Sequence, residues 1–450
     1  RELLAEGALV SGFIPVYQTL DRRAARVFLR AATGALLAVN TLVVGLGILL
    51  APAIVDLLTT RVHFSAQQAA LAVVLTRIMF PFLGFISLAA LAMGVLNAGE
   101  RPAAFALAPV AFNLAAILVV LERNVLPIPD LALGWAWTIG GVVQFAFQLP
   151  ALARLGSLMW PSFRWHKALG RVVRLMAPTA LTTSARQVSN VLLNRLATTA
   201  SLGAVTVLFN ADTVFQLVLS LGAVSPAMAF FPRMSSAAAQ GDLEGLRRHL
   251  TDGLRLLNFL LMPAAVLLII LSRPTVDLIF LGGEFTAQEA LRTARALVAY
   301  STGLLPWGLL MLLNRSYFAR QLVTAPVLVS TSAFASNIVL FHLLITPLGE
   351  VGLALSTAIS GWLALLAMLF WVHRDLHLNL RTLGSHSARL VLATLALALA
   401  CELAARLPSP AGTLGTLAQL TIASGAGGVA YLAVCLALGV KEAQRLLRRR

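Results

Sequence analysis

Apolar runs long enough to cross a lipid bilayer recur along almost the whole chain, and they constrain its fold more than any other feature. A membrane-spanning helix needs about 20 apolar residues to cross roughly 30 Å of hydrocarbon. The runs lack the alternation of apolar and polar positions, over roughly ten residues, that is typical of a membrane barrel. Hydrophobic residues make up 59% and charged residues 12% of the 450 residues, which leaves no soluble domain of useful size. The sequence therefore predicts an all-α, polytopic membrane protein.

We expect about twelve complete spans, each near the length that a bilayer requires. They cover residues 31–54, 70–96, 105–121, 131–152, 175–200, 204–231, 256–280, 296–313, 327–345, 351–372, 388–403 and 417–440. A partial span, residues 3–20, precedes them.

The basic residues occupy alternate connections between these spans. Arg22, Arg23 and Arg26 lie in the first basic connection, and every second connection after it is basic, up to the tail at 441–450. The connection after residue 200 holds no basic residue. Because cytoplasmic connections carry an excess of Lys and Arg, the net charge of +16 indicates a cytoplasmic C-terminus rather than nucleic-acid binding.

Sequence signatures of enzymes are lacking. The chain has no G-x-x-x-x-G-K-[ST] nucleotide loop, no H-E-x-x-H zinc helix and no G-x-S-x-G elbow. Its two cysteines, Cys401 and Cys435, lie inside predicted spans and offer neither a disulfide framework nor a Cys-based metal site. We therefore expect neither an enzyme nor a cofactor or metal, and ATP-driven transport by this chain alone is excluded.

An internal repeat divides the chain. Arg77 recurs as Arg295 and Gly134 as Gly352, both 218 positions later. Three motifs recur 217 positions later: Phe13-x-Pro15 as Phe230-x-Pro232, Leu96-Asn97 as Leu313-Asn314, and Ala108-Pro109-Val110 as Ala325-Pro326-Val327. Because the offset covers an even number of spans, about six, the copies share one orientation, as in parallel repeats of transporters.

The repeat predicts two six-helix lobes and two extra C-terminal helices. We expect an N-terminal lobe in residues 1–155, a C-terminal lobe in 168–380, a helix pair in 386–440 and a cytoplasmic basic tail in 441–450. Counterparts of residues 175–200 and of half of 204–231 would precede residue 1. We therefore expect an N-terminally truncated sequence, with a first lobe that lacks one helix and half of the next, roughly forty or more residues.

Ionisable groups inside spans are costly and are functional candidates by default. Arg1 and Glu6 could flank a water-filled cleft that receives an anion, or they could be ordinary interfacial charges. Arg186 and Arg195 lie nine residues apart, on nearly the same helical face, and with Asn190 they give that helix a polar side. This side could line a cavity or form hydrogen bonds between helices.

Three further charged residues in or near spans have other candidate roles. Asp212 could contact a substrate or pair with one of these arginines and hold the lobes together. Arg77 and Arg295 lie near span ends, which favours a snorkelling or packing role over a functional one.

Several motifs occur in one order along essentially the whole chain. They are RELLAEGALVSGFIP at 1–15, RIMFP at 77–81, Leu96-Asn97, Pro102-Ala103, Ala108-Pro109, Asn113, Gly140-Gly141, Gln144, QLP at 148–150, Phe285-Thr286-Ala287, Tyr300 and YFARQLVTAPV at 317–327. In this order the chain resembles the MurJ (MviN) family of lipid II flippases, part of the multidrug/oligosaccharidyl-lipid/polysaccharide exporter superfamily.

The resemblance implies two lobes around a central cationic cavity and a terminal helix pair that forms a groove for a polyprenyl tail. Arginines would bind the anionic pyrophosphate of the lipid. The family's A-D-R-x-x-[EQ] pattern stands here as Ala211 to Gln216, so Thr213 occupies the place of a substrate-binding Arg and Gln216 matches the last position. Arg186 or Arg195 could compensate, or the chain could handle another substrate or be impaired.

The leading hypothesis is a flippase that moves undecaprenyl-pyrophosphate-linked peptidoglycan precursor (lipid II) from the cytoplasmic to the periplasmic leaflet by alternating access. The alternatives are a flippase or exporter for another polyprenyl-linked glycan or a drug, and a scaffold of the cell-wall synthesis complex that does not transport. We expect a multi-pass protein of the bacterial inner membrane. Its expected partners are the lipid-linked anionic precursor and membrane lipids, and a coupling ion is a further candidate.

Overall fold

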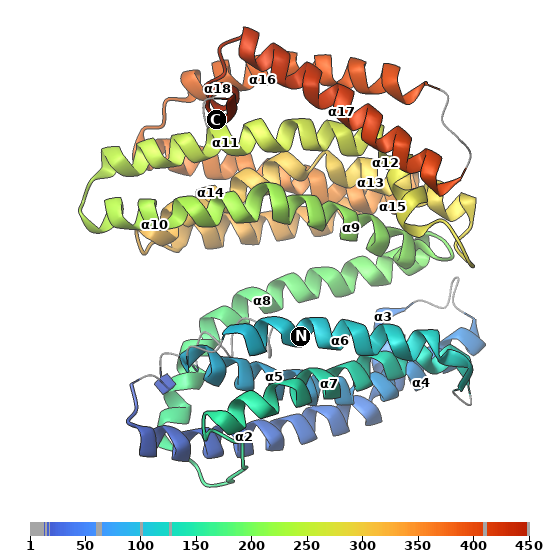
Figure 1. Cartoon of the computed structure of the whole chain (residues 1–450), viewed down its shortest axis with the longest axis vertical. Helices are drawn as coiled ribbons and strands as arrows, with labels where there is room; N and C mark the ends of the chain where they lie inside the picture. The colour runs from blue at the N-terminus through green and yellow to red at the C-terminus, as the bar shows by residue number, and fades with distance from the viewer. Residues whose placement is uncertain are drawn as a thin grey trace. The chain divides into compact units, whose positions relative to one another are not determined.

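The computed structural model describes residues 13, 16–17, 19–59, 65–99, 102–125, 128–407 and 412–447. These residues form helices and short connections, with one isolated β-bridge between Gly282 and Phe285. The chain divides into two compact units, Arg1–Arg195 and Leu196–Arg450 (Figure 1). The predicted partial span at 3–20 lies largely outside the described residues.

Unit 1 is a bundle of antiparallel and broken helices. Its α-helices are α2 (Arg22–Leu49), α3 (Ala51–Leu58), α4 (Ala66–Met79), α5 (Pro81–Ala98), α6 (Pro102–Leu121), α7 (Ala132–Arg154) and most of α8 (Lys167–Ala200), with two 3₁₀ turns, η2 (Arg123–Val125) and η3 (Pro129–Leu131). Proline sets one of the breaks, since Pro81 begins α5 directly after α4 and lacks the N–H that would continue the helix.

Helix α5 is largely buried and packs against α7 and α2. Asn40 of α2 donates a hydrogen bond from Nδ2 to Ser87 Oγ of α5 at 2.7 Å, and Arg77 donates from Nε to the Ile48 carbonyl at 3.3 Å. Gly141 of α7 lies so close to α5 that an added Cβ would meet Phe82 at 2.7 Å. The Arg77 bond supports the packing role expected for that residue.

Unit 2 is built around α11, which packs against α10, α14 and α16. Its helices are α9 (Ala204–Leu219), the π-turn η4 (Ser220–Val224), α10 (Ser225–Ala239), α11 (Leu243–Ile270), α12 (Ser272–Phe280), α13 (Ala287–Ser301), α14 (Leu304–Ala319), α15 (Thr324–Leu376), α16 (Leu380–Ala405), α17 (Thr413–Ala437) and α18 (Lys441–Leu447). Helices α16 and α17 pack along each other, and the Tyr431 hydroxyl of α17 donates to the Phe259 carbonyl of α11 at 2.8 Å (Figure 1).

Eight helices in the described part of the chain are long and apolar enough to cross a membrane, or nine if the bent pair α13–α14 counts as one span. The chain is therefore an all-helical, polytopic membrane protein. The expectation of about twelve covers the whole chain, whereas this count covers the described residues, and most side chains of residues 175–190 in the predicted span 175–200 lie outside them. Two further differences are physical. Helix α15 holds two predicted spans, and the apolar part of α6, Ala106–Leu121, is shorter than a full span.

Gly349 breaks α15 between the predicted spans 327–345 and 351–372, with φ 55° and ψ −135°. Side chains other than hydrogen are strongly disfavoured in this region. We expect Gly349→Ala to lower the free energy of unfolding by about 1–3 kcal/mol, measured as a lower melting temperature of the purified chain in detergent. Gly425→Ala in α17, where an added Cβ meets nothing within 4 Å, is the matched control and should not destabilise. Equal melting temperatures for the two variants would contradict this account.

Candidate functional site

Helix α9 carries three of the residues singled out from the sequence. Asp212 and Gln216 are one helical turn apart and half-buried, and Gln216 Nε2 donates to Asp212 Oδ1 at 3.4 Å. Thr213 is exposed, and its hydroxyl donates to the Phe209 carbonyl one turn back at 2.8 Å. The helix thus presents a carboxylate, an amide and a hydroxyl within two turns.

The remaining faces of α9 explain why these groups lie where they do. Ala211, Val214 and Phe215 are buried, and the Phe215 ring lies 5.8 Å from the Tyr300 ring of α13. Packing against α13 fixes the rotation of α9 and leaves an exposed stripe at every fourth residue: Phe209, Thr213, Leu217 and Leu221. Thr213 is the polar member of this apolar stripe. An arginine at that position would place a cation on the exposed side of α9.

The structure does not place the other predicted site residues beside Asp212, Thr213 and Gln216. Arg195 lies near the end of α8 with an exposed side chain. Arg186 and Asn190 lie on the same helix, but their side chains are outside the described residues. Arg1 and Glu6 are outside them altogether. The structure therefore brings together Asp212, Thr213 and Gln216, and the predicted grouping of the arginines stays a prediction.

A turn of π-helix follows α9 and changes the direction of its continuation. The Ser225 N–H bonds to the Ser220 carbonyl five residues back, instead of four. Pro226 supplies the cause, because it has no N–H for Gly222 and its ring would clash with that carbonyl. Turns of this kind are frequent at functional sites. This one separates the polar turn of α9 from α10 and gives the span a place to bend.

Sequence reasoning missed an ion-pair network at the end of unit 2 where α9 begins. Arg292 of α13 donates from Nε to Glu350 Oε1 at 2.7 Å, from Nη1 to the Leu202 carbonyl at 2.9 Å, and from Nη2 to Ser201 Oγ. The Ser201 hydroxyl also donates to Glu350 Oε2 at 3.1 Å. The network joins the turn before α9, the helix α13 and the break in α15. No local sequence signal could have shown it, because its members lie 58 to 149 residues apart.

Among the described residues, no group of three or more His, Cys, Asp or Glu side chains could hold a metal ion. Arg273 and Asp277 of α12 form an ordinary ion pair at 2.8 Å, one turn apart. The polar turn of α9 therefore offers hydrogen bonds and one negative charge. This chemistry is suited to binding and orienting a ligand.

Known proteins of one family match the chain over most of its length. The family model described as "Lipid II flippase MurJ" matches residues 1–422. The chain is 31% identical over 393 residues to the probable lipid II flippase MurJ of Vibrio cholerae, covering 84% of this chain and 74% of that protein. It is 31% identical to the lipid II flippase MurJ of Burkholderia cenocepacia, covering 81% of this chain and 72% of that protein.

Solved structures show the same fold. An inward closed lipid II flippase MurJ superposes with a TM-score of 0.80 at 24% identity, over 97% of this chain and 89% of that chain. An inward-facing multidrug resistance MATE family transporter of the MOP superfamily superposes with a TM-score of 0.66 at 17% identity, over 82% of this chain and 87% of that chain. These likenesses establish the helical transporter fold of the described chain.

Proposed function

Because this chain belongs to the lipid II flippase MurJ family, we propose that it moves lipid II, an undecaprenyl-pyrophosphate-linked peptidoglycan precursor, from the cytoplasmic to the periplasmic leaflet of the bacterial inner membrane. The observation that carries the proposal is the unbroken family match over residues 1–422. The chain is a membrane transporter and not an enzyme. Catalysis of a covalent step is not required, since only the position of the lipid changes.

Two lobes that alternate in access would perform this movement. We infer an N-terminal lobe in residues 1–155, a C-terminal lobe in 168–380, a helix pair in 386–440 and a basic tail in 441–450. The 217-residue repeat supports the two lobes, and the packing of α16 and α17 along each other supports the helix pair. The excess of basic residues at alternate connections supports a cytoplasmic C-terminus.

The pyrophosphate of the lipid would bind to cationic and amide side chains. We propose Arg1, Glu6, Arg186, Asn190, Arg195, Asp212, Thr213 and Gln216 as the substrate-binding set. A guanidinium can form two parallel hydrogen bonds with phosphate oxygens, so the arginines would supply most of the affinity. With Thr213 in place of an arginine, Arg186 or Arg195 would have to provide the missing positive charge.

Asp212 would act by positioning a neighbour instead of contacting the phosphate. A carboxylate beside pyrophosphate would be repelled, since like charges at close range oppose each other. Its Oδ1 accepts one N–H of Gln216, which orients the amide and leaves its second N–H for the ligand. Asp212 and Gln216 would therefore form one unit of the site.

Depletion of the protein in its host tests the proposal. We expect lipid II to accumulate in the cytoplasmic leaflet, measured with a membrane-impermeant reagent that reaches only the outer leaflet of spheroplasts. Re-expression of the chain should return the precursor to the outer leaflet. An unchanged leaflet distribution after depletion would favour the scaffold, and accumulation of a different polyprenyl-linked glycan would favour another substrate.

A further inference from the structure

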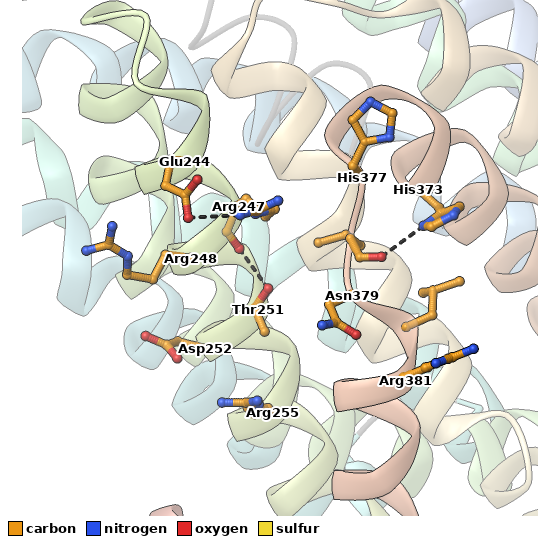
Figure 2. Close-up of a pocket in the computed structure, with 12 residues that line it drawn as sticks. Glu244, Arg247, Arg248, Thr251, Asp252, Arg255, His373, His377, Asn379 and Arg381 are labelled. Atoms are coloured by element: carbon orange, nitrogen blue, oxygen red, sulfur yellow. Dashed lines mark hydrogen bonds and ion pairs between the residues drawn. The ribbon is translucent and has the colours of Figure 1, made fainter.

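A cavity of about 730 Å³ lies within unit 2, between the first turns of α11 and the connection from α15 to α16 (Figure 2). Arg247, Arg248 and Arg255 reach it from α11, and Arg381 reaches it from the first turn of α16. His373 and His377 line it from the end of α15. The size is within the range of cavities that bind small molecules, roughly 300–1,000 Å³.

The cavity has an excess of positive charge. Its four arginines face two carboxylates, Glu244 and Asp252, so two positive charges remain when the histidines are neutral. Glu244 lies at the exposed edge and pairs with Arg247 at 2.8 Å. Deeper along α11, the buried Nε of Arg255 has no hydrogen-bond partner within the described part of the chain. A buried guanidinium N–H without a partner is costly, and Arg255 adds a positive charge at the cavity wall.

The backbone adds to the attraction for an anion. His377 adopts a left-handed conformation, φ 48°, that ends α15 and turns the chain toward α16. Asn379 caps α16 by accepting the Thr382 N–H at 3.1 Å, so the positive end of the helix dipole adjoins the cavity beside Arg381. His373 is held by a hydrogen bond between Nδ1 and the Leu378 carbonyl at 2.9 Å (Figure 2). This bond holds the imidazole ring at the wall of the cavity.

Topology alone does not account for this arrangement. The rule for cytoplasmic connections explains why many basic residues occur there. It does not explain why several of them line one cavity. Here, arginines more than a hundred positions apart in the sequence, Arg255 and Arg381, line the same space. Arg374, one residue after His373, lies in the same connection but does not line the cavity. Its guanidinium lies over the Trp371 ring, 5.6 Å from the ring centre.

We propose that this cavity binds a phosphate-bearing anion. Arginine forks match phosphate oxygens in geometry as well as charge. The two excess positive charges would balance one doubly charged diphosphate group or two singly charged phosphodiesters. The phosphate could belong to a water-soluble compound or to the headgroup of an anionic lipid, and both present the same oxygens to the arginines.

Calorimetric titration of the whole chain with inorganic pyrophosphate, in nanodiscs of phosphatidylcholine alone, tests whether the cavity binds a water-soluble phosphate compound. We expect Arg381→Gln to weaken binding roughly tenfold or more, as is typical when a charged hydrogen bond is lost. Arg374→Gln removes the same charge from the same end of unit 2 and should change the affinity less than about twofold. Arg381 is exposed, so its loss leaves the packing of α16 intact, and an unchanged melting temperature without ligand verifies this.

Native mass spectrometry of the same variants, from nanodiscs of equal parts phosphatidylcholine and phosphatidylglycerol, tests the lipid source. Retention of phosphatidylglycerol by the parent chain and by Arg374→Gln, with loss in Arg381→Gln, would assign the cavity to a lipid headgroup. Pyrophosphate binding with the same variant pattern would assign it to a soluble phosphate. If neither probe binds, or if both variants lose either probe equally, the proposal is wrong.

Discussion

Replacing Glu350 with leucine should lower the stability of unit 2 by about 1–3 kcal/mol, because Arg292 would keep a partly buried charge without its carboxylate partner. The side chains of Arg292 and Glu350 are 22% and 13% exposed, so water would only partly replace the lost carboxylate. The guanidinium would keep its bonds to Ser201 and the Leu202 carbonyl but lose its only charged partner in the network. The melting temperature of the purified chain in detergent measures the effect.

A double variant separates the ion pair from the packing around it. Glu350→Leu combined with Arg292→Met leaves no unpaired charge, so most of the lost stability should return. Glu402 and Arg406 form the matched control, because this pair at 3.2 Å is 51% and 72% exposed. Glu402→Leu should therefore cost less than about 1 kcal/mol. Equal losses of stability for Glu350→Leu and Glu402→Leu would show that the network does not hold together the turn before α9, helix α13 and the break in α15.

The membrane class and most helices could be predicted from the sequence because apolar length is a local property. The predicted span at 204–231 lies inside the continuous run from α9 to α10, and the one at 131–152 nearly coincides with α7. Breaks inside spans were harder to place. The span predicted at 70–96 is divided at Phe80, where Pro81 begins a second helix. Proline permits such a break, but packing against the neighbouring helices decides whether the chain uses it.

The candidate site was only partly predictable for the same reason. Asp212 and Gln216 are four residues apart, so helical geometry alone places them together. Arg292 and Glu350 are 58 residues apart. Arg247, Arg248 and Arg381 lie in basic connections, which by themselves indicate only the orientation in the membrane. Their convergence depends on the path of α15 and α16, which no local pattern contains.

Replacement of Arg195 with alanine should abolish growth of a strain whose own copy of the protein is depleted, with the variant still inserted in the membrane. Arg195 is one of the three arginines in the proposed substrate-binding set, so its loss would remove much of the attraction for pyrophosphate. We expect flipping to slow by roughly tenfold or more, since a charged hydrogen bond is worth about that factor. The growth assay and an outer-leaflet assay for lipid II together measure the effect.

Two variants make this result specific. Arg195→Lys keeps the charge but not the planar fork, so it should restore transport only in part. Arg174→Ala removes an exposed arginine from the other end of the same helix and should leave transport near the parent level. Because a scaffold requires surface contacts but no cation facing a lipid phosphate, full growth of Arg195→Ala would favour the scaffold. A graded loss from arginine through lysine to alanine would instead support phosphate binding, since the planar guanidinium fork binds phosphate oxygens better than an ammonium group does.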